Sequence, residues 1–496
     1  MLNIGNNREC FFDDYLLDTE KTTAEFRLHE PVRREVVMTC AEAWEGDGCD
    51  YQNFFFDDEF PGVDGRYPAG VYRMYYLGWN TPNGAADCKP WHDIVVCYAE
   101  SPDGIHWEKP ILGLSEFEGS KENNIILGAE FECIFDNFMV FRDDNPACPA
   151  DERYKGIASY ESKEKRDPRP NVVLYSYLSA DGIHFRRGRV VTDKGMFDSL
   201  NVIFWDERVK LYRGYIRGFH YIPESGDLNA GIRDIRYIES ADFVNWTEPE
   251  MLDFGEGDDY PLYTNLVSPY YRAPQMYLGF PTRYMERQAW TETFDELCGA
   301  EKRKERMKMH PRFGLTVTDC VFMCSRDGKK FFRHEDAFLR PGPENGRNWL
   351  YGDCYPARGF VETPSEIEGE PNELSMFIPR NHFMNIPKEV VRYTLRLDGF
   401  ASLHAGYRKE ETVMTKPFVY DGSVLRINFA TSARGYLYVT LRCGDKTIES
   451  PETFGDSVDR RVFFPAGGVS AFSGKEVTME IRMRDADLYA FRFAKE

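Results

Sequence analysis

A short turn of one kind recurs along this chain of 496 residues. Each close copy begins with Ser, places Asp two residues later, usually followed by Gly, and ends in an aromatic residue. The Ser and Asp side chains can bond backbone groups of the turn, Gly allows a positive φ, and the aromatic ring can pack between neighbouring units. Four close copies and a degenerate fifth recur at intervals of 61 to 85 residues: Ser101–Trp107, Ser179–Phe185, Ser240–Trp246, Ser325–Phe331 and Leu397–Leu403. A repeat of this length is typical of the blades of a β-propeller.

Runs with the character of β-strands precede each turn. In the first unit these runs are Tyr51–Asp58, Gly70–Trp79 and Ile94–Glu100, and similar runs occur in the other units. We expect a fourth, outer strand after every turn. Aromatic residues make up 15% of the chain, which favours β-structure with a large core. Four strands in each of five units predict an all-β chain with a five-bladed propeller over residues 31–404.

Two segments depart from the repeat. Residues 284–312 are charged and helix-prone and interrupt the fourth unit. A solvated helix is the favoured interpretation, and a lid over the site is the alternative. After residue 404 the turn disappears while the alternation of strands continues, which predicts a β-sandwich over residues 405–496. Residues 1–30, with a strand-like run at Phe11–Leu17, are expected to pack on one of these domains.

Composition limits which classes of partner and which cellular location we expect. The net charge of −21 disfavours nucleic acid and anionic membranes as partners, and no run of 18 apolar residues predicts a membrane span. The twelve cysteines lack the spacing of metal ligands, so we expect no metal and no cofactor. Scattered thiols without a signal peptide predict a cytoplasmic protein, with a trimmed secretion signal as the alternative. The oligomeric state is left open.

Acidic residues stand at the start of the first predicted strand in four units. Asp50, Asp136 and Asp198 begin the first three, and Asp353 has the same place in the fifth. The innermost strands of a propeller begin at the rim of its central funnel, so these side chains should converge there. Like-charge repulsion makes such convergence costly, which favours a catalytic role. A second set of acids, expected to be ordinary turn residues, follows seven or eight residues later at Asp57, Asp143 and Asp206.

The ends of the second strands should reach the same rim, because neighbouring strands in a blade are antiparallel. Arginine side chains there can hold a neighbouring carboxylate in its charged form or bind an anionic group of a substrate. Trp79 and Tyr284 can stack on the face of a sugar. The predicted substrate-binding residues are Trp79, Arg217, Arg283, Tyr284, Arg380 and His382.

The strands that start with Asp and the Ser-x-Asp-Gly turns resemble the five-bladed propeller glycosidases, a superfamily with invertases, levansucrases, arabinanases and β-xylosidases. With the C-terminal sandwich, the chain is most similar to the invertase-type glycoside hydrolase family 32. The resemblance implies that Asp50 is the nucleophile or base and that Asp136 stabilises the transition state. In that family a Glu in blade three is the general acid, and here Asp198 stands in its place. The invertase motifs Trp-Met-Asn-Asp-Pro-Asn-Gly and Glu-Cys-Pro are absent.

Three functions follow from this pattern. The first is a glycoside hydrolase that acts on a small sugar or oligosaccharide with Asp50, Asp136 and Asp198, and with Asp353 in reserve. The second is a glycoside phosphorylase in which arginines form a phosphate pocket. The third is a non-catalytic carbohydrate-binding propeller. Motifs of serine hydrolases, P-loop enzymes, dinucleotide-binding proteins and zinc proteases are absent.

Overall fold

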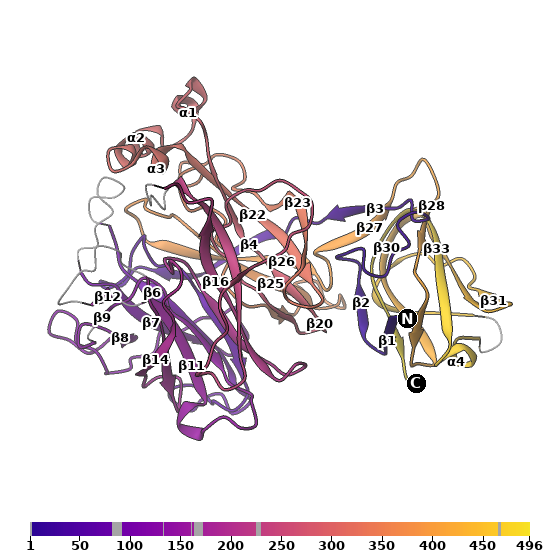
Figure 1. Ribbon diagram of the computed structural model, residues 1–496, viewed down its shortest axis with the longest axis horizontal. Coiled ribbons are helices and arrows are strands. Elements are labelled where there is room, and N and C mark those ends of the chain that lie inside the picture. Colours follow the sequence, from indigo (N-terminus) through magenta and orange to yellow (C-terminus); the bar gives the residue numbers. More distant parts are fainter. Residues whose placement is uncertain are drawn as a thin grey trace.

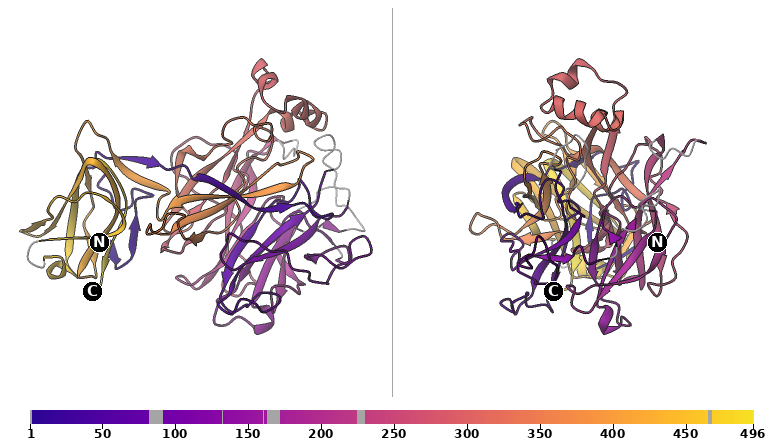
Figure 2. Two further views of the ribbon diagram at one scale, coloured as in Figure 1. Left: turned by 180° about the vertical axis from the view of Figure 1, so that it is seen from behind. Right: turned by 90° about the vertical axis from the view of Figure 1, so that its left-hand side faces the viewer.

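The computed structural model describes residues 2–81, 92–131, 133–159, 161–162, 172–224, 230–464 and 468–496. Strands dominate this part of the chain and form a broad propeller beside a narrower C-terminal domain (Figure 1, Figure 2). The predicted architecture, a five-bladed β-propeller followed by a β-sandwich, is confirmed.

Each blade is an antiparallel sheet. Its innermost strand comes first in the sequence, except that the outer strand of blade five, β4 (Val32–Cys40), precedes all the others. Blade four contains one additional strand, β21, which also pairs with β22. The strands are, in blade one, β5 (Asn53–Asp57), β6 (Val71–Gly78), β7 (Val95–Ser101) and β8 (Ile125–Leu127); in blade two, β10 (Met139–Arg142), β11 (Tyr154–Ser159), β13 (Leu174–Ser179) and β14 (Arg186–Thr192); in blade three, β15 (Val202–Asp206), β16 (Leu211–His220), β17 (Ile232–Ser240) and β18 (Glu250–Met251); in blade four, β19 (Ser268–Tyr270), β20 (Ala273–Gly279), β21 (Thr282–Glu286), β22 (Thr316–Ser325) and β23 (Phe331–Leu339); and in blade five, β24 (Val361–Thr363), β25 (Glu373–Arg380), β26 (Lys388–Arg396) and β4 (Val32–Cys40).

The outer strand of blade five comes from the beginning of the propeller segment. β4 pairs antiparallel with β26, whereas the chain after the fifth turn enters β27 (Ala401–Ala405) of the C-terminal domain. The prediction that an outer strand follows every turn is therefore wrong for the fifth unit. Pairing the first strand of the propeller with its last blade closes the ring and removes two open sheet edges.

The recurring turns have the local bonding that their residues predict. In the first copy the amide of Gly104 donates to Ser101 Oγ at 2.9 Å, and the next two amides donate to Asp103 Oδ1 at 2.9 Å. Gly104 has a φ of 75°, and a Cβ added there would lie 2.6 Å from Val361 of blade five. Phe243 takes the place of Gly in the third copy, also at a positive φ of 62°. The turns thus join each blade to its neighbour in a conformation that favours glycine.

The acids at the far ends of the innermost strands are more than turn residues. Asp57 is fully buried, lies 3.0 Å from Arg73 Nη1 and accepts a hydrogen bond from the Tyr154 hydroxyl of blade two at 2.7 Å. The same kind of link joins blade two to blade three and blade three to blade four, through Asp143 with Lys155 and Tyr212 and through Asp206 with Arg213 and Tyr277. These carboxylates connect adjacent blades through buried ion pairs and hydrogen bonds.

The C-terminal domain is built around two long strands, β30 and β33, which pair with each other and with shorter strands on both sides. Side chains from these strands form a separate buried core. The first 28 residues belong to this domain, because β1 pairs parallel with β29, while β2 pairs antiparallel with β33 and β3 antiparallel with β27. The elements are β1 (Leu2–Gly5), β2 (Arg8–Cys10), β3 (Glu25–Leu28), β27, β28 (Glu411–Met414), β29 (Phe418–Tyr420), β30 (Val424–Cys443), β31 (Lys446–Glu449), β32 (Asp456–Val462), α4 (Gly468–Phe472) and β33 (Glu476–Ala494).

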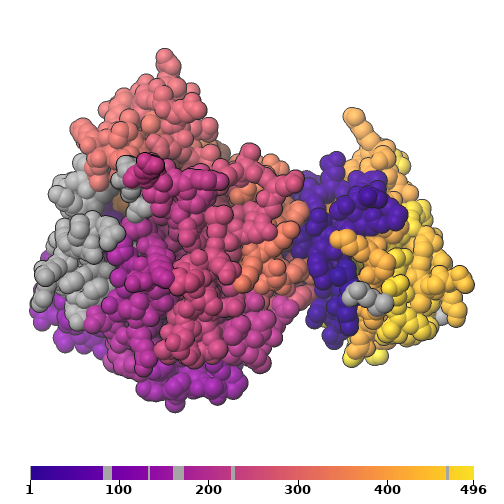
Figure 3. All heavy atoms as spheres, in the orientation of Figure 1, coloured from indigo at the N-terminus to yellow at the C-terminus, as the bar shows by residue number. Residues whose placement is uncertain are grey.

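The N-terminal segment connects the two domains. Figure 3 shows these residues in indigo at the junction between the propeller and the C-terminal domain. The strand predicted at Phe11–Leu17 is instead β2, just before it, followed by turns. The reason is that adjacent phenylalanines enter different cores: Phe11 packs in the C-terminal core and Phe12 in the propeller core.

Three short helices, α1 (Glu292–Glu296), α2 (Ala300–Met307) and α3 (Pro311–Leu315), stand at one end of the propeller (Figure 1). Arg303 of α2 is only 1% exposed, and its guanidinium donates to the carbonyls of Gly314, Thr316 and Leu350. Burial lowers the pKa of Arg303 to about 10. The favoured prediction of a solvated helix holds for one face only: Glu301 and Lys304 are exposed, whereas the face with Arg303 is buried. Within the described ranges, no helix has the length and apolar character needed to cross a membrane.

Candidate active site

A cavity of about 200 Å³ lies where the innermost strands of the propeller begin. This funnel cavity is lined by carboxylates, arginines and aromatic rings from several blades and from the helical insertion. The lining residues are Asp50, Tyr51, Leu77, Trp79, Asp136, Asp198, Arg233, Tyr263, Arg306, Met309, Arg312, Phe313, Tyr351, Tyr355, His382 and Phe383. The cavity therefore contains three of the four predicted acids, from three consecutive blades. None of the exposed turn acids, such as Asp103 and Asp242, is among its lining residues.

Asp50, just before β5, is held by two groups from blade five. Its carboxylate forms an ion pair with Lys388 Nζ and lies 2.8 Å from His382 Nδ1. Burial raises the pKa of Asp50, but the charge of Lys388 and the contacts with His382 outweigh it, and the pKa lies below its usual range. Asp50 is therefore charged at neutral pH.

His382 presents its other ring nitrogen without a protein partner. Burial and the charge of Lys388 lower its pKa to about 4, so the ring is neutral at pH 7. Nε2 is buried and has no hydrogen-bond partner in the described part of the chain, while Nδ1 is 2.9 Å from Lys388 Nζ. The ring lines the cavity, so Nε2 is available to a polar group of a bound ligand.

Asp198 lies before β15 and belongs to a hydrogen-bonded chain across the cavity. It is 3.3 Å from Arg217 Nη1 and accepts a hydrogen bond from the Tyr263 hydroxyl at 3.1 Å. The hydroxyls of Tyr263 and Tyr51 are 3.0 Å apart. Its side chain is 43% exposed, so it is accessible from the cavity. Arg217 was predicted to bind substrate, yet it is not a lining residue and pairs with Asp198 instead.

Asp136, before β10 in blade two, is half-buried and lines the same cavity. Its charge and that of Asp198, together with the larger effect of burial, raise the pKa of Tyr51 well above its usual value. Tyr51 thus lies between the carboxylates of two blades as a neutral hydrogen-bonding group.

Asp353 does not line the funnel cavity, and the prediction that all four acids reach it is wrong for this residue. The ring of His382 covers the preceding turn, where a Cβ added to Gly352 would lie 2.2 Å from it. Burial raises the pKa of Asp353 to about 6 against the opposing effect of the backbone amides of Trp349 and Leu350. Oδ2 of Asp353 is buried without a hydrogen-bond partner in the described residues.

Two of the predicted substrate-binding arginines also lie outside the cavity. Arg283 Nη2 pairs with Asp319 at 2.6 Å, and Arg380 pairs with Glu389. Successive side chains of a strand point to opposite faces. In β21 the ring of Tyr284 points toward the cavity side, so Arg283 points away.

The arginines at the cavity are others, which the sequence interpretation missed. Arg306 and Arg312 come from the helical insertion and Arg233 from β17. Arg303 and Arg306 are three residues apart on α2 and share its buried face. This spacing in the sequence could have indicated that one face of the helix packs against the propeller. Side chains of the insertion thus line the funnel cavity, and a lid over the site stays a prediction.

A cluster of tyrosines forms one side of the cavity. The ring of Tyr263 stacks on Tyr284 and on Tyr355, with centroids 5.8 and 5.4 Å away. Tyr284 is 2% exposed and lies behind Tyr263 rather than in the lining. Trp79 does line the cavity, as predicted, and packs edge-on against Phe383. Aromatic faces of this kind stack well on sugar rings.

The backbone beside the predicted site is unusual. Tyr51, Asn381 and Phe383 have positive φ values of 61°, 71° and 53°, and each is adjacent to Asp50 or His382. Non-glycine residues in this region cost about 1–3 kcal/mol each and cluster at functional sites. The strain places the cavity side chains and is consistent with a functional role for them.

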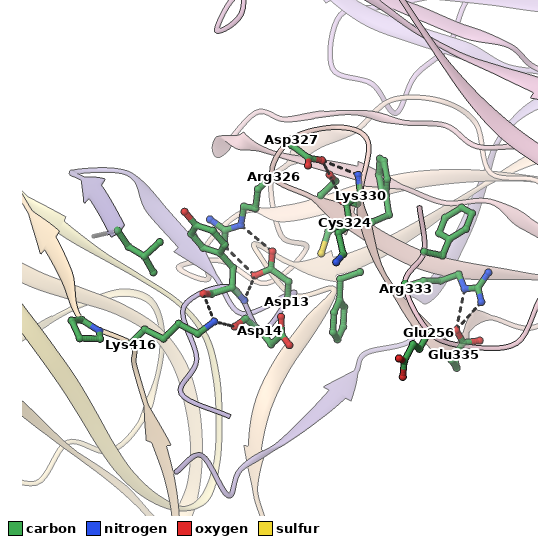
Figure 4. A pocket seen from close by; sticks show the side chains of 18 of the residues that line it. Asp13, Asp14, Glu256, Cys324, Arg326, Asp327, Lys330, Arg333, Glu335 and Lys416 are labelled. Carbon is green, nitrogen blue, oxygen red and sulfur yellow. Dashed lines mark hydrogen bonds and ion pairs between the residues drawn. The ribbon is translucent and has the colours of Figure 1, made fainter. Parts of the chain in front are cut away.

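A larger cavity, of about 1,300 Å³, lies between the two domains (Figure 4). Its two arginines are paired with carboxylates of the same cavity: Arg326 binds Asp13, and Arg333 binds Glu335. We therefore assign the candidate active site to the smaller funnel cavity, where Arg233 and Arg312 form no ion pair with any of the described residues. Within the described residues, no group of three or more His, Cys, Asp or Glu side chains is arranged to hold a metal ion.

No protein-family model and no curated protein matches the chain. Among solved structures, an N-acetylgalactosamine deacetylase from F. plautii, in complex with blood group B trisaccharide, is 12% identical, with 77% of this chain and 96% of that chain covered and a TM-score of 0.44. A Bombyx mori family 32 β-fructofuranosidase is 11% identical, with 95% of both chains covered and a TM-score of 0.39. A thermostable family 43 glycoside hydrolase is 12% identical, covers 71% of this chain and 92% of its own, and has a TM-score of 0.41. Likenesses this remote carry no argument about activity.

Proposed function

We propose that the protein is a glycoside hydrolase that acts in the funnel cavity on a small sugar or the terminal residue of an oligosaccharide. The observation that carries this proposal is the convergence of Asp50, Asp136 and Asp198 from three blades on one cavity. A volume of about 200 Å³ lies below the usual range for ligand sites, which suits a single sugar residue.

Glycosidic cleavage needs a proton donor and a carboxylate that attacks the sugar or activates water. Asp50 fits the second role because Lys388 keeps it charged. Asp198 is the proposed acid: it is the accessible carboxylate, and Arg217 is placed to stabilise the anion that remains after proton transfer. Asp136 is the proposed stabiliser of positive charge on the sugar in the transition state.

The test is a panel of aryl glycosides, including pyranosides, furanosides and uronides, assayed with wild-type protein and with Asp50→Asn. We expect release of the aryl group from at least one class, and a loss of turnover in a variant that remains folded by circular dichroism, although Lys388 loses its buried ion-pair partner. The matched control is Asp103→Asn, an exposed turn acid that should retain full activity. Wild-type rates in the Asp50 variant would refute the assignment.

A phosphorylase is the second candidate, favoured by the arginines at the cavity. Sugar release that depends on inorganic phosphate and yields a sugar phosphate would establish it. Binding of sugars with no cleavage of any glycoside in the panel would instead support a non-catalytic carbohydrate-binding propeller.

A further inference from the structure

Two arginines of the funnel cavity are buried without a counter-ion. Arg233 and Arg312 are 5% and 7% exposed. Neither forms an ion pair with any residue that the structure describes, and Nε of each is buried without a hydrogen-bond partner. A buried guanidinium needs an anion or several acceptors to offset its lost hydration.

The two side chains meet at one place. Arg233 comes from β17 in blade three and Arg312 from α3, yet both lie near the ring of Tyr284, with Cζ atoms 4.8 and 5.8 Å from its centroid. Burial, with the positive charges of Arg217 and Arg312, lowers the pKa of Arg233. Cationic groups therefore crowd this side of the cavity.

The carboxylates of the cavity do not neutralise them. Asp50 is engaged by Lys388 and Asp198 by Arg217. The lining holds three arginines and three carboxylates, and two of these carboxylates are already paired with Lys388 and Arg217, which stand just outside the lining. The cavity is thus locally cationic in a protein with a net charge of −21, which indicates an anionic ligand.

Resting on the glycosidase function proposed above, we propose that Arg233 and Arg312 bind the carboxylate of an acidic sugar, so that the substrates are glycosides of uronic acids. Guanidinium groups bind planar carboxylates through paired hydrogen bonds. Arg233 and Tyr284 belong to blades three and four, across the ring of blades from Asp50 in blade one. A uronic acid carries its carboxylate on a different ring carbon from the one whose bond is cleaved, so the two sides can engage one sugar at once.

The experiment measures binding and needs no turnover. Methyl glycosides of glucuronic and galacturonic acid are titrated calorimetrically into the full-length protein in phosphate-free buffer and compared with methyl glucoside and methyl galactoside. At least one uronide should bind ten-fold or more tightly than its neutral counterpart. Arg233→Met and Arg312→Met should each remove this preference and leave the affinity for the neutral sugar within about two-fold. Arg283→Met, a paired arginine outside the cavity, is the matched control and should behave as wild type.

Equal affinity for uronides and neutral sugars, or no uronide binding, in wild-type protein overturns the proposal, whether or not the variants fold. Inorganic phosphate is titrated in parallel. If phosphate binds in an Arg312-dependent way and uronides have no advantage, the oxyanion is phosphate, and the proposal fails in favour of the phosphorylase. A uronide that binds but is not cleaved supports this inference and contradicts the hydrolase, whereas cleavage of neutral glycosides alone does the reverse.

Discussion

The innermost strands of blades one to three have one acid shortly before the strand begins and a second acid where it ends. The two sets of acids differ in their surroundings. Asp57, at the far end of β5, is fully buried and contacts Arg73 and Tyr154, so its oxygens are occupied by protein groups. Asp198, at the near end of β15, is 43% exposed toward the funnel cavity. The residue type and the position relative to a strand are alike. The difference is whether the neighbouring blade covers the carboxylate or leaves it facing a cavity.

This comparison separates the two sets of carboxylates by whether they line the funnel cavity. At the far ends, tyrosine and a cation from the same or the next blade complete each site. At the near ends, charged and aromatic groups surround space for a ligand. Three variants test whether the distinction holds.

The largest effect is expected for Asp198→Asn at the near end. Loss of the proposed acid should lower kcat by about 10⁴-fold on a confirmed substrate, because the amide cannot donate that proton. The variant should also be less stable than wild type, because the buried Arg217 loses its ion-pair partner, so its folding is checked by circular dichroism. The rate is measured under saturating conditions with an alkyl glycoside or oligosaccharide of the sugar that the aryl panel identifies, because its poorer leaving group needs the proton. Asp242→Asn, an exposed turn acid outside the cavity, should keep the wild-type rate. A loss below ten-fold in the Asp198 variant would remove Asp198 from the mechanism.

A smaller effect, on stability rather than rate, is expected for Asp57→Asn at the far end. Removing this charge leaves Arg73 buried without its ion-pair partner, which should lower the free energy of unfolding by about 3–5 kcal/mol. Urea denaturation measures the change. The neighbouring Asp58, whose side chain is 63% exposed, is the matched control, and Asp58→Asn should cost at most about 1 kcal/mol. Equal costs for the two variants would show that the far-end ion pairs do not hold the blades together.

The smallest effect concerns Asp353, which lies in the loop before β24, does not line the funnel cavity and has no ion-pair partner among the described residues. Burial raises its pKa to about 6, so the folded protein binds a proton more tightly than the unfolded chain. The stabilisation is fully present below about pH 4 and is lost as the pH rises through about 6; it amounts to about 3 kcal/mol. In the Asp353→Asn variant the free energy of unfolding should no longer fall by this amount between pH 4 and pH 8. Relative to wild type, the variant should therefore be more stable at pH 8 than at pH 4. The prediction is wrong if the free energy of unfolding changes with pH by the same amount in the variant and in wild type between pH 4 and 8.

Much of the fold was predictable because its signals are local. The bonds of the Ser-x-Asp-Gly turn join groups within six residues, and they recur in four blades. Three of the four predicted acids reach one cavity because strand direction alone decides which strand ends share a rim. Arg283 and Arg380 were misplaced because the side that a residue faces near a strand end changes with each residue along the strand.

The sequence by itself determined the five-unit repeat, the strand order within blades, the change to a sandwich, and the rim positions of Asp50, Asp136 and Asp198. Tertiary structure alone decided that β4 closes blade five, that Lys388 and His382 hold Asp50, and that an insertion in blade four brings Arg312 over the cavity. The physical reason is separation along the chain. Turn bonds and alternation act between near neighbours, whereas Asp50 meets Lys388 across 338 residues, and no local pattern encodes which distant side chain completes a buried charge.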